Sequence, residues 1–110
     1  MEKFSVSDVV FVNFPFSNLK KSKLRPAVIL ASAQNHDWIL CQVTSKSYAD
    51  ESSLRLLETD FKHGSLNLVS YIRPGKIFTA HESIIIKKVG TLNDEIYTSL
   101  IEKIVTLLRS

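Results

Sequence analysis

The feature that most constrains the fold is one change in the spacing of apolar residues near the C-terminus. Up to about residue 92, apolar side chains alternate or form short runs rich in Val, Ile and Phe, which predicts β-strands. Beyond it, Ile96, Leu100, Ile104 and Leu107 recur every three or four residues, which predicts one amphipathic helix. A chain of short strands followed by a single helix is predicted to be mainly β (α+β), with the strands in a small closed or nearly closed barrel.

The apolar runs and the turn residues between them predict where each element lies. We expect strands or extended segments at 8–16, 26–33, 38–43, 52–57, 66–72, 76–79 and 83–89. Polar segments should connect them as loops or turns at 17–24, 34–37 and 44–50. We also expect one helical turn at 59–64, closed by Gly64, and a turn at Pro74-Gly75. Asn93 should cap the helix, which ends near Arg109.

Length and composition indicate the class of protein. A chain of 110 residues suits a single domain, residues 1–110, and a hydrophobic fraction of 45% excludes a disordered chain. The one cysteine, Cys41, cannot form an internal disulfide, which favours a reducing compartment, and its apolar strand makes it a buried residue rather than a nucleophile. The N-terminus lacks a signal-peptide core and no apolar run is long enough to span a bilayer, so we expect a cytoplasmic protein without membrane association.

Metal and cofactor chemistry is not predicted. His36, His63 and His81 are far apart in sequence, and no cysteine or carboxylate stands at ligand spacing from them. The chain also lacks a glycine-rich phosphate loop and a Gly-x-Ser-x-Gly motif. We therefore expect no metal site and no cofactor.

Cations and hydroxyls at the expected strand ends are the remaining chemical groups. Arg25 precedes a strand, Thr44 and Ser45 follow one, and Arg73 precedes the Pro-Gly turn. A guanidinium and a hydroxyl on one face of a barrel suit phosphate recognition, and the net charge of +3 permits a nucleic-acid partner. By spacing alone, a surface ion pair for Arg25 and a strand-end cap for Thr44 remain open. The loop lysines likewise allow either a solvated connection or a substrate contact.

Five segments of the chain resemble the MazF/PemK (Kid) family of toxins from toxin–antitoxin systems. They are Ser7–Val12, Lys23–Leu30, Cys41–Ser45, Ser70–Thr79 and Lys87–Leu92. The most specific parts are the Arg25-Pro26 strand opening and the Val43-Thr44-Ser45 strand ending. The resemblance covers about residues 6–108.

The resemblance implies an SH3-like β-barrel with a C-terminal helix, and a homodimer. It implies a metal-independent endoribonuclease that cleaves single-stranded RNA, usually mRNA, and a small antitoxin whose acidic tail covers the RNA groove. The catalytic residues it implies are Arg25 and Thr44, with Arg73 as a second arginine in some members. In that mechanism the RNA 2′-hydroxyl attacks its neighbouring phosphorus, Arg25 stabilises the developing charge, and Thr44 donates a hydrogen bond.

Other polar residues close to these positions are expected to bind the substrate. They are Ser45, Lys46, Lys20, Lys21, Lys23 and Lys76.

The chain departs from the family pattern at three positions. Ser7 stands where the family usually has glycine, which concerns a turn. Gly75 and Phe78 stand where Kid-like members carry an aspartate and an arginine, and His81 or Glu82 are candidates to replace the lost function. The departures leave open a catalytically degenerate module that binds RNA or antitoxin. A third interpretation, the related CcdB toxins that poison DNA gyrase, ranks lowest because the two motifs match the ribonuclease branch.

Overall fold

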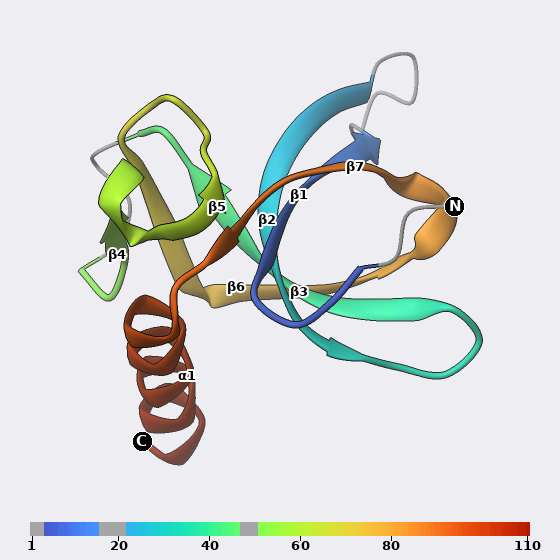
Figure 1. Ribbon diagram of the computed structural model, residues 1–110. Helices are drawn as coiled ribbons and strands as arrows, with labels where there is room; N and C mark the ends of the chain where they lie inside the picture. The colour runs from blue at the N-terminus through green and yellow to red at the C-terminus, as the bar shows by residue number, and fades with distance from the viewer. Residues whose placement is uncertain (1–3, 16–21, 47–50) are drawn as a thin grey trace.

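Seven antiparallel strands form one curled sheet, and a single α-helix packs against it, in the computed structural model, which describes residues 4–15, 22–46 and 51–110 (Figure 1). The elements are β1 (Asp8–Pro15), β2 (Ser22–Ser32), β3 (Asp37–Thr44), β4 (Leu54–Leu56), η1 (Glu58–Asp60), β5 (Phe61–Gly64), β6 (Ser70–His81), η2 (Glu82–Ile84), β7 (Ile85–Leu92) and α1 (Asp94–Arg109). The strand order is β4-β6-β3-β2-β1-β7-β5. The mainly β prediction, with one C-terminal helix, is confirmed.

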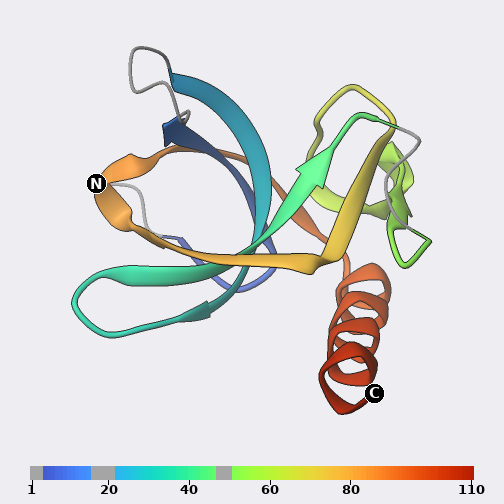
Figure 2. The same cartoon turned by 180° about the vertical axis from the view of Figure 1, so that it is seen from behind.

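The sheet is strongly curled (Figures 1 and 2). Each of its two faces carries its own cluster of apolar side chains. Val9 and Val28 belong to the cluster that contains Leu100 of α1, and we call their side of the sheet the helix face. Val10 and Ala27, one residue away on the same strands, belong to the other cluster inside the curl, and we call that side the barrel face. Alternation of side chains along each strand therefore divides the core between the two faces.

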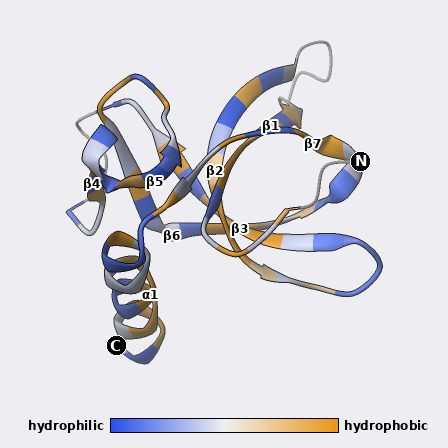
Figure 3. Ribbon diagram, in the orientation of Figure 1, coloured by the Kyte–Doolittle hydropathy of each residue, from blue (hydrophilic) through white to orange (hydrophobic). Residues whose placement is uncertain are grey.

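Hydrophilic and hydrophobic residues alternate along most of the strands (Figure 3). The hairpin between β2 and β3 extends away from α1 and ends in a hydrophilic turn, in which Asn35 and His36 have φ of 60° and 64°. Two successive residues with positive φ are typical of tight hairpin turns, so the predicted turn at 34–37 is confirmed. No helix in the described ranges is long and apolar enough to cross a membrane.

The β1–β2 hairpin is longer than the sequence indicated. Lys23 and Arg25 were expected in or beside a loop, whereas β2 begins at Ser22 and these residues pair with Phe14 and Val12 of β1. Because β2 pairs with β1 along its full length, β2 extends through a polar segment whose composition does not predict a strand. Arg25 therefore lies inside a strand.

The predicted break at Pro74-Gly75 is wrong. β6 runs from Ser70 to His81, and its pairing with β3 shifts between Val43, opposite Ile72, and Cys41, opposite Ile77. The extra residues of β6 form a bulge in which Pro74 is buried, and a bulge is a place where a strand accepts proline. The expected extended segment from Leu66 is also wrong before Ser70, where β6 begins.

Local signals around the small 3-10 turns were only partly correct. The helical turn expected at 59–64 is the shorter η1. Gly64 does not close that turn, because it is the last residue of strand β5. The strand expected from Ser83 begins at Ile85, after η2. The predicted C-terminal helix is confirmed as α1, which ends at Arg109. Asn93 caps it as predicted, because its side chain accepts a hydrogen bond from the Ile96 N–H at 3.0 Å.

The N-terminal turn explains one departure from the family pattern. Ser7 has a φ of 74°, a conformation that glycine adopts without cost and that other residues adopt only at a penalty. The next residue, Asp8, is buried and accepts hydrogen bonds from the Ser5 N–H at 2.8 Å and the Thr91 hydroxyl at 3.0 Å. Lys88 Nζ lies 3.8 Å from the same carboxylate. Asp8 thus holds β1 to β7 and fixes the turn despite the serine.

Candidate active site

Arg25 and Thr44 lie on adjacent strands, each two residues beyond the last pair that joins those strands. The β2–β3 pairing ends with Ala27 opposite Gln42; beyond it, Arg25 pairs with Val12 of β1 and Thr44 pairs with Tyr71 of β6. Alternate residues of a strand point to the same face, so Arg25 shares a face with Ala27, and Thr44 shares that face with Gln42. Because Arg25 and Ala27 are two residues apart, that face is the barrel face.

A row of paired residues extends from Thr44 across two more strands. Thr44 pairs with Tyr71 of β6, and Tyr71 pairs with Arg55 of β4. Thr44, Tyr71 and Arg55 therefore form one row across β3, β6 and β4, and Arg25 lies on the same face of β2. Tyr71 and Thr44 are half-buried, whereas Arg55 is exposed.

Arg73 joins this row through the bulge in β6. Ile72 pairs with Val43 and is buried in the cluster of the helix face, so the next residue, Arg73, points to the opposite side. On β3 the bulge lies opposite Gln42, two residues before Thr44. The backbone oxygen of Arg73 accepts a hydrogen bond from Cys41 Sγ at 2.9 Å, which joins the bulge to β3.

The Thr44 hydroxyl is oriented by its own turn. Thr44 Oγ1 accepts a hydrogen bond from the Lys46 backbone N–H at 3.2 Å. That bond occupies a lone pair of the oxygen and leaves its O–H to donate to a ligand on the barrel face. An oriented donor on the same face as a guanidinium suits the binding of a phosphate group, since both can hydrogen-bond to its oxygens.

A pocket of about 150 Å³ lies next to this row. Its walls come from β1, β3 and β6, and the residues are Phe14, Gln42, Lys76, Ile77 and Phe78. The rings of Phe14 and Phe78 are 4.8 Å apart between centroids and inclined by 56°. Phe78, where Kid-like members were expected to have an arginine, thus makes an aromatic wall.

The structure distributes the remaining predicted substrate-binding residues over both faces. Lys76 lines the pocket, and Lys23 lies on the barrel face two residues before Arg25. Ser45 and Phe11 line a second cavity of about 150 Å³. Phe11 points to the helix face, opposite to the face of Thr44. The exposed Lys46 supplies the backbone N–H to Thr44. Lys20 and Lys21 lie outside the described residues.

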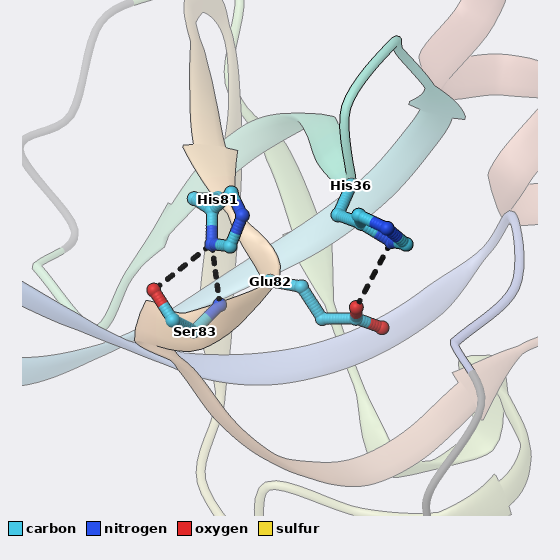
Figure 4. Close-up of polar contacts among 4 residues, drawn as sticks. All are labelled: His36, His81, Glu82 and Ser83. Carbon is cyan, nitrogen blue, oxygen red and sulfur yellow. Dashed lines mark hydrogen bonds and ion pairs between the residues drawn. The ribbon is translucent and has the colours of Figure 1, made fainter.

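The candidates His81 and Glu82 contact Ser83 and His36 (Figure 4). Glu82 Oε2 lies 3.6 Å from Nδ1 of His36, in the turn between β2 and β3. His81 Nδ1 accepts the Ser83 backbone N–H at 3.0 Å and caps η2. This turn lies at the other end of the hairpin from Arg25 and Thr44, about seven residues or roughly 23 Å along each strand. Along the hairpin, His81 and Glu82 therefore lie at the end away from Arg25 and Thr44.

Sequence reasoning missed Gln42, Tyr71, Arg55 and Phe14 as members of the site. Tyr71 carries a signal in retrospect, because it precedes Arg73 by two residues on the same strand and so shares its face. The others depend on which strands pair, which local sequence does not reveal. Within the described ranges, no group of three or more His, Cys, Asp and Glu residues is arranged to hold a metal ion.

Comparisons with known proteins agree with this fold. The family model described as "PemK-like, MazF-like toxin of type II toxin-antitoxin system" matches residues 5–108. A search of curated protein sequences finds no significant match.

Solved structures with the same fold are distant in sequence. MazF from Deinococcus radiodurans is 16% identical, with a TM-score of 0.77 over 100% of both chains. A MazE–MazF structure from the same organism is 17% identical, with a TM-score of 0.76 over 94% of each chain. A mycobacterial endoribonuclease in complex with its cognate antitoxin is 12% identical, with a TM-score of 0.73 over 94% of this chain and 92% of that one.

Proposed function

Because the chain belongs to the PemK-like, MazF-like family of toxins from type II toxin–antitoxin systems, we propose that it is a sequence-specific endoribonuclease that cleaves single-stranded RNA, such as mRNA, without a metal ion. The observation that supports this proposal is that Arg25 of β2 and Thr44 of β3, two residues beyond the Ala27–Gln42 pair, share the barrel face on adjacent strands. Arg73 and Arg55 add positive charge on the same face, where a polyanion would lie.

In the proposed reaction the nucleophile belongs to the RNA. The 2′-hydroxyl oxygen forms a bond to the adjacent phosphorus, the bond from phosphorus to the 5′-oxygen breaks, and the proton lost by the first oxygen is balanced by one gained by the second. The products are a 2′,3′-cyclic phosphate and a 5′-hydroxyl. Arg25 donates to the non-bridging oxygens as charge develops, and the Thr44 O–H donates to a phosphoryl oxygen or the leaving group. Preorganised donors of this kind each lower the barrier by about 3–4 kcal/mol.

The same face is proposed to be covered by an antitoxin. The solved structures include MazF bound to MazE and a mycobacterial endoribonuclease bound to its cognate antitoxin. An acidic antitoxin segment would complement the cations of Arg25, Arg73 and Arg55 as RNA does. We further propose that the toxin is a homodimer that acts in the cytoplasm, where its mRNA substrate is found.

The test is cleavage of a long single-stranded RNA in EDTA, with analysis of the product ends. Arg25→Ala should lower the cleavage rate at least about 100-fold and leave urea unfolding unchanged. Arg109→Ala, the same substitution at the far end of α1, should cleave like the wild type. Cleavage by Arg25→Ala at the wild-type rate, or product ends other than cyclic phosphates, would remove Arg25 or the transesterification from the proposal.

A second candidate function is favoured by Gly75 and Phe78. Gly75 and Phe78 supply no carboxylate and no guanidinium, so two groups of the mechanism of Kid-like members are lacking at these positions. A catalytically degenerate module would bind single-stranded RNA or antitoxin in a salt-sensitive manner without forming product. Cyclic-phosphate ends from the wild type would exclude it.

A further inference from the structure

We propose that the pocket between Phe14, Gln42, Lys76 and Phe78 binds one unpaired nucleobase next to the scissile phosphate, and that Gln42 determines which base is accepted. The proposal rests on the ribonuclease function above and adds the part of the site that reads sequence. Phosphate contacts alone position a nucleic acid without distinguishing bases, so sequence specificity needs a separate contact of this kind.

The shape and walls of the pocket suit a flat ring. It encloses about 150 Å³, and its apolar surface comes from Phe14, Ile77 and Phe78. The two phenyl rings contact one another at 4.8 Å between centroids, and both residues are half-buried, which holds the rings in place. Bases of single-stranded RNA are commonly held by stacking on aromatic side chains.

Gln42 supplies the polar group that the aromatic wall lacks. Its side chain is half-buried in the pocket wall, and within the described residues its amide forms no hydrogen bond. An amide offers a donor and an acceptor next to one another, and so matches a base edge that presents the complementary pair. Among the described residues no buried side-chain nitrogen or oxygen lacks a partner, so the Gln42 amide is open to solvent, and a base edge can take the place of the water there.

The pocket is also placed correctly relative to the phosphate. Gln42 precedes Thr44 by two residues on β3, so the two side chains share the barrel face at about 7 Å along the strand. The exposed Lys76 of β6 adds positive charge to the lining of the pocket. The cationic rim and the flat apolar interior together favour a nucleotide over a peptide side chain.

The experiment compares cut-site profiles on a pool of random single-stranded RNA by sequencing the products. The variants are Gln42→Leu, which keeps the side-chain size, and Gln42→Glu, which replaces the donor. Both should change base preference at one position beside the cleaved bond, with a loss of about tenfold in discrimination for Gln42→Leu. Phe14→Leu should lower kcat/KM on all sequences through a raised KM. The matched control is Gln34→Leu in the exposed turn between β2 and β3, and its profile should equal that of the wild type.

Each outcome decides one of the two proposals. If the wild type cleaves and Gln42→Leu keeps its profile, the base-binding pocket is wrong while the ribonuclease stands. If Gln42→Leu alters affinity for the antitoxin only, the pocket serves the protein partner and the inference is also overturned. If the wild type does not cleave, the proposed function fails, and fluorescence anisotropy with A, C, G and U homopolymers then tests the pocket. A wild-type order of base preference that Gln42→Leu abolishes would support the pocket, and an order that it leaves unchanged would contradict it.

Discussion

Tyr97 joins α1 to the centre of the sheet through a single hydrogen bond. Its hydroxyl donates to the backbone oxygen of Leu30 on β2 at 3.1 Å. Burial raises the pKa of the Tyr97 phenol above its ordinary value of 10.0, because the charged phenolate is poorly solvated there. The folded protein therefore holds this proton more tightly than the unfolded chain.

This shift predicts how stability changes at high pH. Keeping the Tyr97 phenol protonated contributes fully to the stability of the fold below pH 10, the pKa of the phenol in the unfolded chain. That contribution is lost as the pH rises from there through the higher pKa of the folded protein. Tyr97→Phe should lower the free energy of unfolding by about 1 kcal/mol at pH 7, where the lost hydrogen bond dominates. Between pH 9.5 and 11 the variant should then lose less stability than the wild type in urea titrations. Parallel pH profiles for the two proteins would show that the phenol does not titrate with folding.

At the scale of the elements, the edge strand β5 is held to the sheet through β7, and two glycines permit the approach. A Cβ on Gly90 would lie 2.7 Å from the Phe61 ring and 2.7 Å from the His63 backbone oxygen. Gly64 has a φ of 70°, and its Cβ would lie 2.2 Å from the Val89 backbone oxygen. The close contact of β5 with β7 thus requires glycine, which has no Cβ atom, at positions 64 and 90.

Gly90→Ala should lower the free energy of unfolding by about 1–3 kcal/mol, because the backbone of β5 or the Phe61 ring must move. Gly75→Ala is the matched control, since nothing lies within 4 Å of its Cβ position, and its effect on stability should stay within about 0.5 kcal/mol. Urea unfolding of both variants measures the difference. Equal stabilities would mean that β5 is free to shift away from β7.

At the scale of the whole molecule, the chain has a net charge of +3. The strands that form the candidate site and its pocket contribute Lys23, Arg25, Arg55, Arg73 and Lys76. If all five contact phosphates of single-stranded RNA, the logarithm of affinity should fall with the logarithm of salt concentration at a slope of about −3.5.

Removal of one of these cations should make the slope shallower by the amount that one phosphate contact contributes. Lys76→Gln is expected to make it shallower by about 0.7, whereas Lys103→Gln on α1 should leave it unchanged. The measurement is binding of a 2′-O-methyl RNA, which cannot undergo the transesterification, across a series of salt concentrations. A slope that responds equally to both substitutions would mean that the RNA does not lie on the barrel face.

The sequence by itself determined the local structure of this protein. Alternation of apolar residues located most of the strands, and the spacing after Asn93 located α1, because these patterns depend only on near neighbours along the chain. The family resemblance also indicated Arg25, Thr44 and Arg73 as site residues, and the motifs that carry it are short and local.

Only the tertiary structure decided which strands pair and in which register. The bulge at Pro74 in β6, the Thr44–Tyr71–Arg55 row and the pocket at Gln42 all follow from pairings between distant parts of the chain. A shift of one residue in any of these registers would send every side chain of the strand to the other face. The register is selected by how the two apolar clusters pack together, so the arrangement of the site depends on the whole core rather than on any segment of the sequence.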